Sequence, residues 1–354
     1  MTATDLGKLP GSQRVLACRG DGQVEIEERE LTPPGPGELL LAMRRSGLCG
    51  TDLFKLGNGG DPSGLVLGHE VVGEVMALGD GVTDFSVGDR VVVAHHVSCG
   101  TCELCLRGSE TMCPTFRENL LDPGGFCEYI LVRERARTTS AYRVPEHLSD
   151  DAAVFMEPAA CVLRGVQRAQ LSGRGLTVIL GAGSMGLLHL LVLKALQPDA
   201  PVLVIDPLAL RQAIARDLGA DAASGPGDEA TALIKELTGD HGADAVFDTV
   251  GGPKRLREAL AFCRQGGSVL LFAHAPEAMT ADFDLNELFK HEKSVVGTYS
   301  GSEKEQREVF SLIASGQLDP SPLVTHTLPL ADFQEGVRLS RACEALKVLY
   351  TPSS

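Results

Sequence analysis

The sequence predicts an α/β protein with two domains, one mostly β and the other built on a doubly wound parallel sheet. Its length of 354 residues suits two domains with room for two cores. Residues 1 to about 155 are rich in glycine, proline and short β-type runs, whereas residues from about 160 to 300 alternate apolar strands with helical stretches. This change of texture predicts the division of the chain.

The first region is expected to be a mostly β domain with irregular lobes. Short β-type runs occur at 39–41, 71–75 and 90–93, and turn-forming residues separate them at 33–37 and 123–125. Short strands that alternate with such turn signals are typical of antiparallel sheets.

The second region is expected to form a parallel sheet that is covered by helices on both faces, because continuous apolar strands alternate with helices. The last stretch, from about residue 299, is too short for a domain of its own, and we assign it to the first domain. The predicted domains are therefore 1–158 with 299–354, and 159–298. The predicted strands are 177–180, 202–205, 243–247 and 268–272, and the predicted helices are 187–196, 208–218 and 254–263.

Composition excludes several classes of function. The apolar fraction of 44% is ordinary for a water-soluble protein. The net charge of −15 argues against nucleic acids and anionic membranes as partners. Residues 1–13 lack a secretory signal, and glycines interrupt the apolar run 176–196, so a cytoplasmic protein is expected. Four of the ten cysteines lie between 99 and 113, which favours a metal site over disulfides.

A dinucleotide-binding motif occupies the turn between the first strand and the first helix of the parallel sheet. Gly181, Gly183 and Gly186 form G-x-G-x-x-G, and Asp206 follows the second strand. The glycines permit the tight turn, the approach of the pyrophosphate and the packing of helix on strand, while the helix N-terminus attracts the phosphates. Asp206 would bind the ribose hydroxyls and favours NAD, although Arg211 leaves room for NADP. The alternative is a glycine-rich turn without a ligand. The predicted cofactor contacts also include Ser184, Met185 and, after the third strand, Val250.

The four clustered cysteines predict a closed, structural zinc site. Cys99, Cys102, Cys105 and Cys113 have the spacing C-x2-C-x2-C-x7-C. Four thiolates leave no open coordination position, so the ion would stabilise a lobe with little core of its own. An iron–sulfur cluster is the principal alternative.

Several motifs together resemble the zinc-containing medium-chain dehydrogenase/reductase (alcohol dehydrogenase) superfamily, over nearly the whole chain. They are Cys49-Gly-Thr-Asp52, Gly68-His-Glu70, Gly88-Asp-Arg-Val91, the four-cysteine lobe and the glycine motif with its aspartate. The resemblance implies a GroES-like catalytic domain, an inserted Rossmann domain, a cleft active site and a homodimer or homotetramer. The Glu157-Pro158 pair resembles the sorbitol and threonine dehydrogenase branch, which has Glu-Pro at this position.

The resemblance also implies a second, catalytic zinc, held by Cys49 and His69. Glu157 would be a direct or water-mediated ligand, and Glu70 a second carboxylate that orients the site or binds the metal transiently. Thr51 would accept the proton of the alcohol, whose oxygen the Lewis-acidic metal polarises. Many relatives have histidine where this chain has Phe54, so the outer proton relay must differ. Cys161, one helical turn after Glu157, is interpreted as a packing residue.

These features predict a zinc-dependent oxidoreductase that interconverts a polyol or secondary alcohol and its ketone or aldehyde with NAD. L-Threonine, or a cyclitol or amino-cyclitol, is an alternative substrate, and a catalytically inactive cofactor-binding protein is a third reading. Tyr299 is a weak candidate for substrate contact, and His189 is expected to pack in the core. His95 and His96, which precede the lobe, are expected to lie in a turn or at the edge of the cleft.

Overall fold

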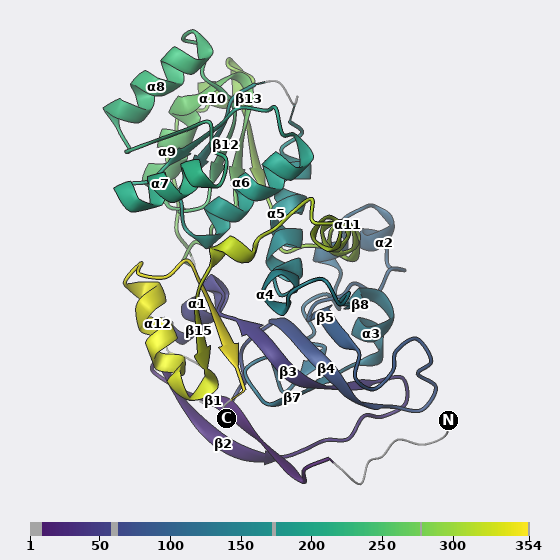
Figure 1. The fold of residues 1–354 in the computed structure, drawn as a ribbon. Helices are drawn as coiled ribbons and strands as arrows, with labels where there is room; N and C mark the ends of the chain where they lie inside the picture. The colour runs from purple at the N-terminus through teal and green to yellow at the C-terminus, as the bar shows by residue number, and fades with distance from the viewer. Residues whose placement is uncertain (1–8, 58–62, 172–174, 277, 353–354) are drawn as a thin grey trace. The chain divides into compact units, whose positions relative to one another are not determined.

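The computed structural model describes residues 9–57, 63–171, 175–276 and 278–352. Its backbone contacts divide the chain into two compact units (Figure 1). The first comprises Met1–Pro158 and Ser302–Ser354, and the second comprises Ala159–Gly301. The chain thus returns from the second unit to the first after residue 301, whereas the predicted boundary lies after residue 298.

The first unit is built on an eight-stranded sheet of order β15-β16-β3-β4-β5-β8, in which β7 also pairs with β3 and β6. Its pairs are antiparallel except β15 with β16. A separate hairpin is formed by β1 and β2. The strands are β1 Ser12–Gly20, β2 Gln23–Glu30, β3 Leu39–Gly47, β4 Glu70–Leu78, β5 Arg90–Ala94, β6 Leu121–Asp122, β7 Tyr129–Val132, β8 Ala141–Arg143, β15 Val324–Pro329 and β16 Lys347–Thr351.

Short helices connect these strands. They are α1 Gly50–Gly57, α2 Glu103–Leu106, α3 Glu134–Ser140, α4 Asp150–Ala153, α11 Glu303–Ala314 and α12 Phe333–Arg341, with 3-10 turns at Glu110–Met112, Ser321–Leu323 and Leu330–Asp332. The core of this unit includes Leu39, Val71, Val91 and Tyr350, none of them more than 1% exposed. The predicted mostly β domain is confirmed.

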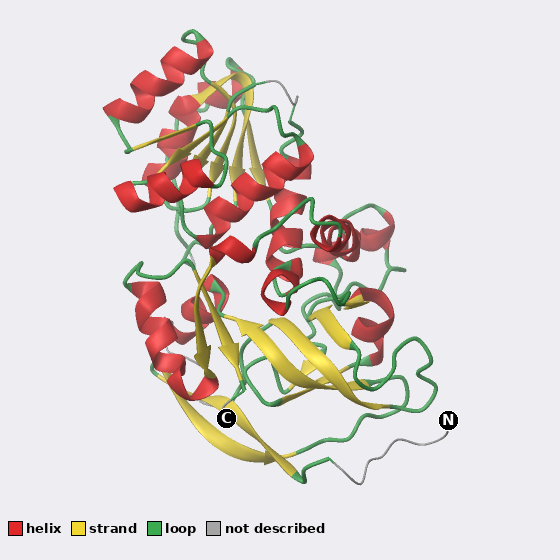
Figure 2. Ribbon diagram, viewed as in Figure 1, coloured by secondary structure: helices red, strands yellow, loops and turns green. Residues whose placement is uncertain are grey.

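The second unit contains a six-stranded sheet of order β11-β10-β9-β12-β13-β14, and its pairs are all parallel. Helices flank this sheet (Figure 2). The strands are β9 Thr177–Leu180, β10 Val202–Ile205, β11 Ala222–Ser224, β12 Ala243–Asp248, β13 Cys263–Leu271 and β14 Ser294–Gly297. The helices are α5 Met156–Arg168, whose first three residues belong to the first unit, α6 Ser184–Leu196, α7 Ala209–Asp217, α8 Asp228–Thr238, α9 Pro253–Phe262 and α10 Asn286–Phe289. The predicted Rossmann sheet is confirmed.

Within the described residues, the helices are too short or too polar to traverse a lipid bilayer.

The pairing of β3, β4 and β16 determines where the chemically important residues of the first unit meet. Gly47 ends β3 and lies opposite Glu70 at the start of β4, and it also pairs with Leu349 of β16. A Cβ atom at Gly47 would collide with the Glu70 carboxylate and would lie 3.0 Å from the Lys347 side chain. Glycine at this position therefore makes room for a pair of charged side chains at the sheet edge.

Candidate functional site

Cys49, His69 and Glu70 converge at the edge of the sheet in the first unit. Cys49 lies in the turn between β3 and α1, and His69 and Glu70 stand where β4 begins. One ligand atom from each residue lies within 4.8 Å of the other two. His69 is 8% exposed and Glu70 is fully buried. The three side chains thus present sulfur, nitrogen and oxygen donors to one point.

Asp52 lies behind this group and organises it. Its carboxylate accepts hydrogen bonds from the backbone N–H groups of Cys49 (3.0 Å) and Gly68 (3.3 Å), and it lies 3.5 Å from Nδ1 of His69. Burial raises the pKa of Asp52, but the positive charge of His69 and these hydrogen bonds outweigh burial and lower it. Burial likewise lowers the pKa of His69, yet the neighbouring Asp52 and Cys49 raise it well above its ordinary value.

Glu70 forms a buried ion pair with Lys347 of β16. The two side chains are 0% and 3% exposed, and the ammonium also donates to the carbonyl of Leu48 at 3.2 Å. Burial lowers the pKa of Lys347, but the charges of Glu70 and Cys49 outweigh it and raise the pKa. Removing one member of such a pair would leave an uncompensated buried charge, so the two residues stabilise one another.

The other predicted site residues differ in exposure. Thr51 is half-buried on α1, and its backbone N–H points to the Cys49 sulfur at 3.5 Å. Glu157, 8% exposed in the first turn of α5, is not among the three converging donors, although its charge acts on Lys347. Of the two predicted carboxylates, Glu70 is the one whose ligand atom lies within 4.8 Å of those of Cys49 and His69. Phe54 and Tyr299 are both half-buried.

The residues at this point fit a zinc ion. Thiolate, imidazole and carboxylate are its usual ligands, and three protein ligands leave a position for water or substrate. Both carboxylate oxygens of Glu70 are buried and lack a hydrogen-bond donor among the described residues, apart from the ion pair with Lys347. Asp52 faces the second ring nitrogen of His69, as carboxylates do behind metal-ligating histidines.

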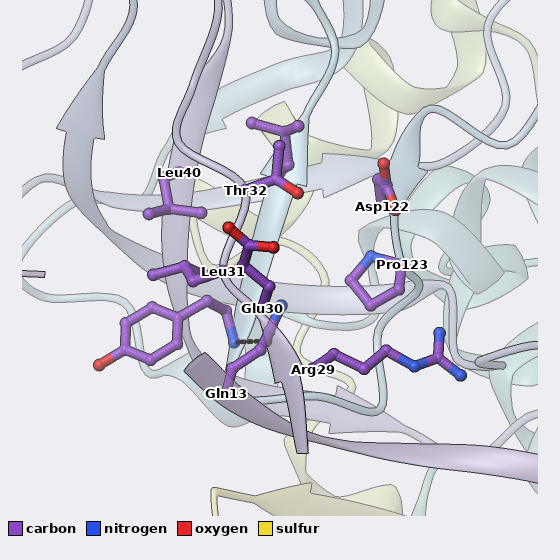
Figure 3. A pocket seen from close by; sticks show the side chains of 10 residues that line it. Gln13, Arg29, Glu30, Leu31, Thr32, Leu40, Asp122 and Pro123 are labelled. Carbon is purple, nitrogen blue, oxygen red and sulfur yellow. Dashed lines mark hydrogen bonds between the residues drawn. The ribbon is translucent and has the colours of Figure 1, made fainter. Parts of the chain in front are cut away.

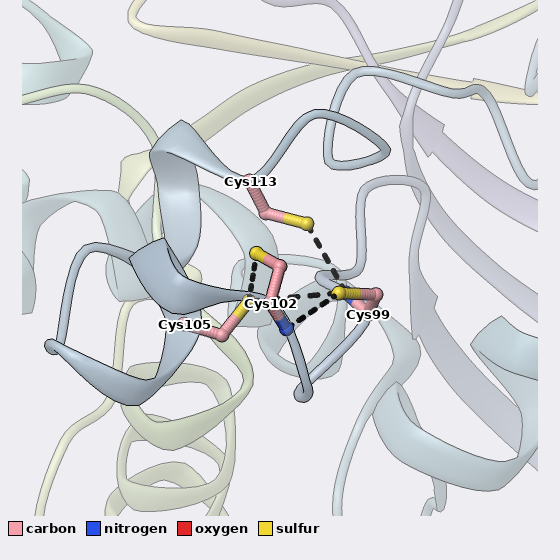
Figure 4. Close-up of side chains that lie close together, drawn as sticks. All are labelled: Cys99, Cys102, Cys105 and Cys113. Atoms are coloured by element: carbon pink, nitrogen blue, oxygen red, sulfur yellow. Dashed lines mark hydrogen bonds between the residues drawn. The ribbon is translucent and has the colours of Figure 1, made fainter.

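The four cysteines of the lobe face one another (Figure 4). Their sulfurs all lie within 4.8 Å, with Cys102–Cys105 at 3.4 Å and Cys99–Cys105 at 3.9 Å. Thiolates around a tetrahedral zinc with Zn–S of about 2.3 Å would be about 3.8 Å apart. The backbone N–H of Thr101, its hydroxyl and the N–H of Cys102 lower the pKa of Cys99 to about 6, which favours the thiolate. The donor set and spacing fit a structural zinc ion.

The glycine motif joins β9 to α6 as the sequence predicted. Gly181 has φ +96, a conformation that favours glycine, and Gly183 is the N-cap of α6. A Cβ atom at Gly186 would collide with the carbonyl of Gly181, so α6 can approach the strand only with glycine there. The N-terminus of α6 lacks a side-chain cap, which leaves its N–H groups available to an anion. The hydroxyl oxygen of Ser184, in the first turn, is buried without a hydrogen-bond partner among the described residues.

Asp206 follows β10 directly and is 4% exposed. Its carboxylate accepts hydrogen bonds from Ala182 N–H (2.8 Å) and Leu208 N–H (2.9 Å), so it also stabilises the glycine turn. Arg211 lies beside this turn, because one of its guanidinium nitrogens is 3.6 Å from the position of a Cβ at Gly183. A carboxylate and an arginine thus both border the turn that would hold the pyrophosphate and the adenosine ribose.

The end of β12 lies beside the same turn. Asp248 accepts hydrogen bonds from Val250 N–H (3.0 Å) and Gly251 N–H (2.8 Å), and Thr249 donates to Leu180 O at 2.7 Å. Val250 is 52% exposed, and its side chain lies close to Gly181. The turn therefore retains an exposed apolar residue next to the predicted dinucleotide site, which fits the NAD(P) group.

Three histidines of the described residues lie in contact with other rings. The ring of His95 contacts that of His69 at a tilt of 41°, with centroids 4.6 Å apart, and the ring of His96 contacts that of His95 at a tilt of 31° and 3.6 Å. His189 is buried against Phe247 and Phe272, which confirms its packing role. A pocket of about 120 Å³ beside the ends of β1, β2 and β6 contains none of the predicted site residues (Figure 3).

Sequence reasoning did not identify Asp52, Lys347 or the contact of His95 with His69. Asp52 stands in the same short motif as Cys49, so its proximity could have been noticed. Lys347 opens an apolar run of β16 and carries no motif of its own. Its role becomes visible only when β16 pairs with β3.

Comparison with known proteins gives the class of the chain. Residues 35–145 match the alcohol dehydrogenase GroES-like domain, and residues 184–315 match the zinc-binding dehydrogenase family. An L-threonine 3-dehydrogenase from Thermococcus kodakarensis is 32% identical over 96% of this chain and 98% of its own length. A sorbitol dehydrogenase from Halalkalibacterium halodurans is 29% identical, with 96% of this chain and 98% of the relative covered.

A solved structure agrees with these sequence relatives. A zinc-binding dehydrogenase from Sinorhizobium meliloti 1021, solved with NADP bound, superposes with a TM-score of 0.85 at 25% identity, covering 97% of this chain and all of that one. Fold and donor groups together define a zinc-dependent dehydrogenase that uses a nicotinamide dinucleotide. The chain belongs to the zinc-containing medium-chain alcohol dehydrogenase superfamily.

Proposed function

We propose that this chain oxidises a polyol or another secondary alcohol to its carbonyl compound with NAD, and runs the reverse reaction with NADH. The observation that carries the proposal is the convergence of Cys49, His69 and Glu70 at the edge of the sheet. Both sorbitol and threonine dehydrogenases are among the relatives, so L-threonine is the second candidate substrate.

The protein residues have distinct parts in this reaction. A zinc ion, when bound, supplies Lewis acidity that lowers the pKa of a substrate hydroxyl. Cys49 and His69 would hold the ion, with Glu70 or Glu157 as the carboxylate ligand. Asp52 keeps the ring of His69 oriented, and Lys347 neutralises Glu70 when that carboxylate is not a ligand. Thr51 would accept the hydroxyl proton and pass it on.

The second unit would supply the hydride acceptor. Gly181, Gly183 and Gly186 admit the pyrophosphate to the N-terminus of α6, and Asp206 would bind the ribose hydroxyls of NAD. A carboxylate repels a 2′-phosphate, so NAD is the favoured cofactor, and Arg211 weakens that preference. We further propose that the chain forms a homo-oligomer. We also propose that it acts in the cytoplasm, because cysteines remain reduced there and none of the ten cysteines forms a disulfide.

The role of Asp206 predicts a change in cofactor choice. Asp206→Ala should raise the Kd for NADH about tenfold, because a hydrogen bond to a charged group is lost. The Kd for NADPH should rise less, since a repulsive charge is removed as well. The binding of both cofactors is followed by their fluorescence. The chain has no tryptophan, so tryptophan emission does not contribute to this signal.

Asp248→Ala is the matched control, because Asp248 also accepts two backbone hydrogen bonds at the end of a neighbouring strand. That variant should alter the two affinities equally. An unchanged ratio of NADH to NADPH affinity in Asp206→Ala would refute the ribose role.

The function itself is tested with a panel of polyols, secondary alcohols, L-threonine and cyclitols. NADH formation is measured with the zinc-loaded protein, after chelation, and after zinc is restored. Turnover of at least one member should disappear on chelation and return with zinc. A folded protein with two zinc ions per chain and no turnover would favour an inactive cofactor-binding protein instead.

A further inference from the structure

We propose that Lys347 is a positioning residue that keeps Glu70 exchangeable as a zinc ligand, because it offers the carboxylate a second cation that belongs to the protein itself. This inference rests on the proposed function and deepens it, since an exchangeable ligand leaves the metal accessible to the substrate hydroxyl. It is drawn from the contacts of Glu70 and Lys347 within the first unit.

The carboxylate of Glu70 lies between two places where a positive charge can meet it. Glu70 is fully buried, and neither of its oxygens has a hydrogen-bond donor among the described residues apart from the ion pair with Lys347. Its ligand atom also lies within 4.8 Å of those of Cys49 and His69. Because a buried carboxylate requires a compensating charge, either Lys347 or a metal ion at this group can supply it.

Lys347 is held beside Glu70 by contacts on several sides. Its side chain is 3% exposed and forms the ion pair with Glu70. Its ammonium also donates to the carbonyl of Leu48 at 3.2 Å and lies 5.7 Å from the centroid of the Phe155 ring, within the range of a cation–π contact. An exposed lysine is a mobile point charge, whereas burial and these contacts fix this one. The cation is therefore a permanent neighbour of the Glu70 carboxylate.

The surrounding charges support this arrangement. Burial lowers the pKa of Lys347, but the charges of Glu70, Cys49 and Glu157 outweigh it, so the ammonium form is favoured. Asp52, a further acidic group, already accepts two backbone hydrogen bonds. Lys347 compensates part of the negative charge that would otherwise act on the metal alone, and it thereby weakens the hold of Glu70 on that metal.

The ion pair gives Glu70 two arrangements. In one, Glu70 completes the donor set of Cys49 and His69. In the other, it pairs with Lys347 alone and leaves a ligand position to the substrate. Without the lysine, the second arrangement would strand a buried charge and would be strongly disfavoured.

The first test is the zinc affinity of Lys347→Met, in protein that keeps the zinc of the four-cysteine lobe. The Kd for zinc at the Cys49 site is measured by competition with a chromophoric chelator. Zinc should bind at least about tenfold more tightly than in the wild type, because Glu70 then has no other cation, and outer partners tune metal sites on this scale. With zinc saturating, kcat for the alcohol that the wild type turns over should fall at least about tenfold.

Cobalt(II) in place of this zinc reports whether Lys347 acts through Glu70. The visible absorption of cobalt depends on its ligands and their geometry. Lys347→Met should therefore change the spectrum, as the carboxylate becomes a permanent ligand. In a Glu70→Gln background, the same substitution should leave the spectrum unchanged. A purely structural role for the lysine would not produce this dependence.

Lys293→Met is the matched control in the other unit. Lys293 is also a buried lysine, 8% exposed, that pairs with one carboxylate, Glu287, and donates to one carbonyl, that of Leu260 at 2.7 Å. Its replacement removes the same charge and the same kinds of contact, so zinc affinity and the cobalt spectrum should stay at wild-type values. If Lys347→Met does not fold, Lys347→Gln takes its place, since glutamine keeps a donor without the charge.

The outcomes separate this inference from the function on which it rests. Unchanged or weaker zinc binding in the folded Lys347 variant, wild-type kcat, an unchanged cobalt spectrum, or the same spectral change in the Glu70→Gln background would overturn the inference. Zinc-dependent turnover of an alcohol by the wild type would still support a dehydrogenase. Tighter zinc binding with a cobalt spectrum that depends on Glu70, but without turnover of any alcohol, would support the positioning role and refute the proposed function.

Discussion

Cys49→Ser is expected to lower kcat/KM by about a thousandfold or more. Loss of the thiolate would remove the metal ligand that stands between β3 and α1, and metal catalysis contributes several kcal/mol to transition-state stabilisation. NADH binding should stay within about twofold of the wild type, because the glycine turn belongs to the other unit. Steady-state kinetics, NADH fluorescence and elemental analysis measure the three effects, and zinc should fall from two ions per chain to one.

The control for this variant is Cys161→Ser, one helical turn after Glu157 on α5. It replaces the same chemical group at a position interpreted as packing, so zinc content and turnover should remain close to the wild type. Wild-type turnover in Cys49→Ser would contradict the catalytic zinc assignment. Loss of one zinc from Cys161→Ser would instead identify Cys161 as a ligand.

Cys105→Ser should release the other zinc ion and destabilise the lobe. Zinc in a closed four-cysteine site contributes directly to folding free energy, and the lobe leaves Leu104, Leu106 and Met112 exposed instead of packing them into a core. For a domain of this size, a loss of several kcal/mol corresponds to a fall in Tm of about 10 °C. Calorimetry and elemental analysis follow the change.

Two controls make the stability prediction decisive. Cys343→Ser alters an exposed cysteine outside the lobe and should leave Tm and zinc content unchanged. If Cys105→Ser does not fold, chelation of the wild type provides the measurement, since removal of the lobe zinc should lower Tm by a similar amount. Two zinc ions and a wild-type Tm in Cys105→Ser would be inconsistent with a structural zinc site, and iron in the purified wild type would indicate an iron–sulfur cluster.

Local patterns in the sequence were sufficient where the chemistry depends on neighbouring residues. The glycines at 181, 183 and 186 act on a single turn, and the four cysteines of the lobe span fifteen residues, from 99 to 113. Mostly apolar runs of four or five residues likewise predicted β9, β10 and β12, since strands that are buried on both faces have no polar alternation. These features were therefore readable without knowledge of the fold.

Only the tertiary structure decided what surrounds the three converging donors. Lys347 reaches Glu70 because β16 pairs antiparallel with β3, whose last residue lies opposite the first residue of β4. The register of β16 with β3 joins residues just over 300 positions apart, and no local periodicity encodes it. The ring contact of His95 with His69 and the approach of Asp52 to His69 also depend on how separate segments pack in the first unit. The sequence by itself therefore determined the class of chemistry, whereas the side chains that surround the three donors were brought together by contacts between distant strands.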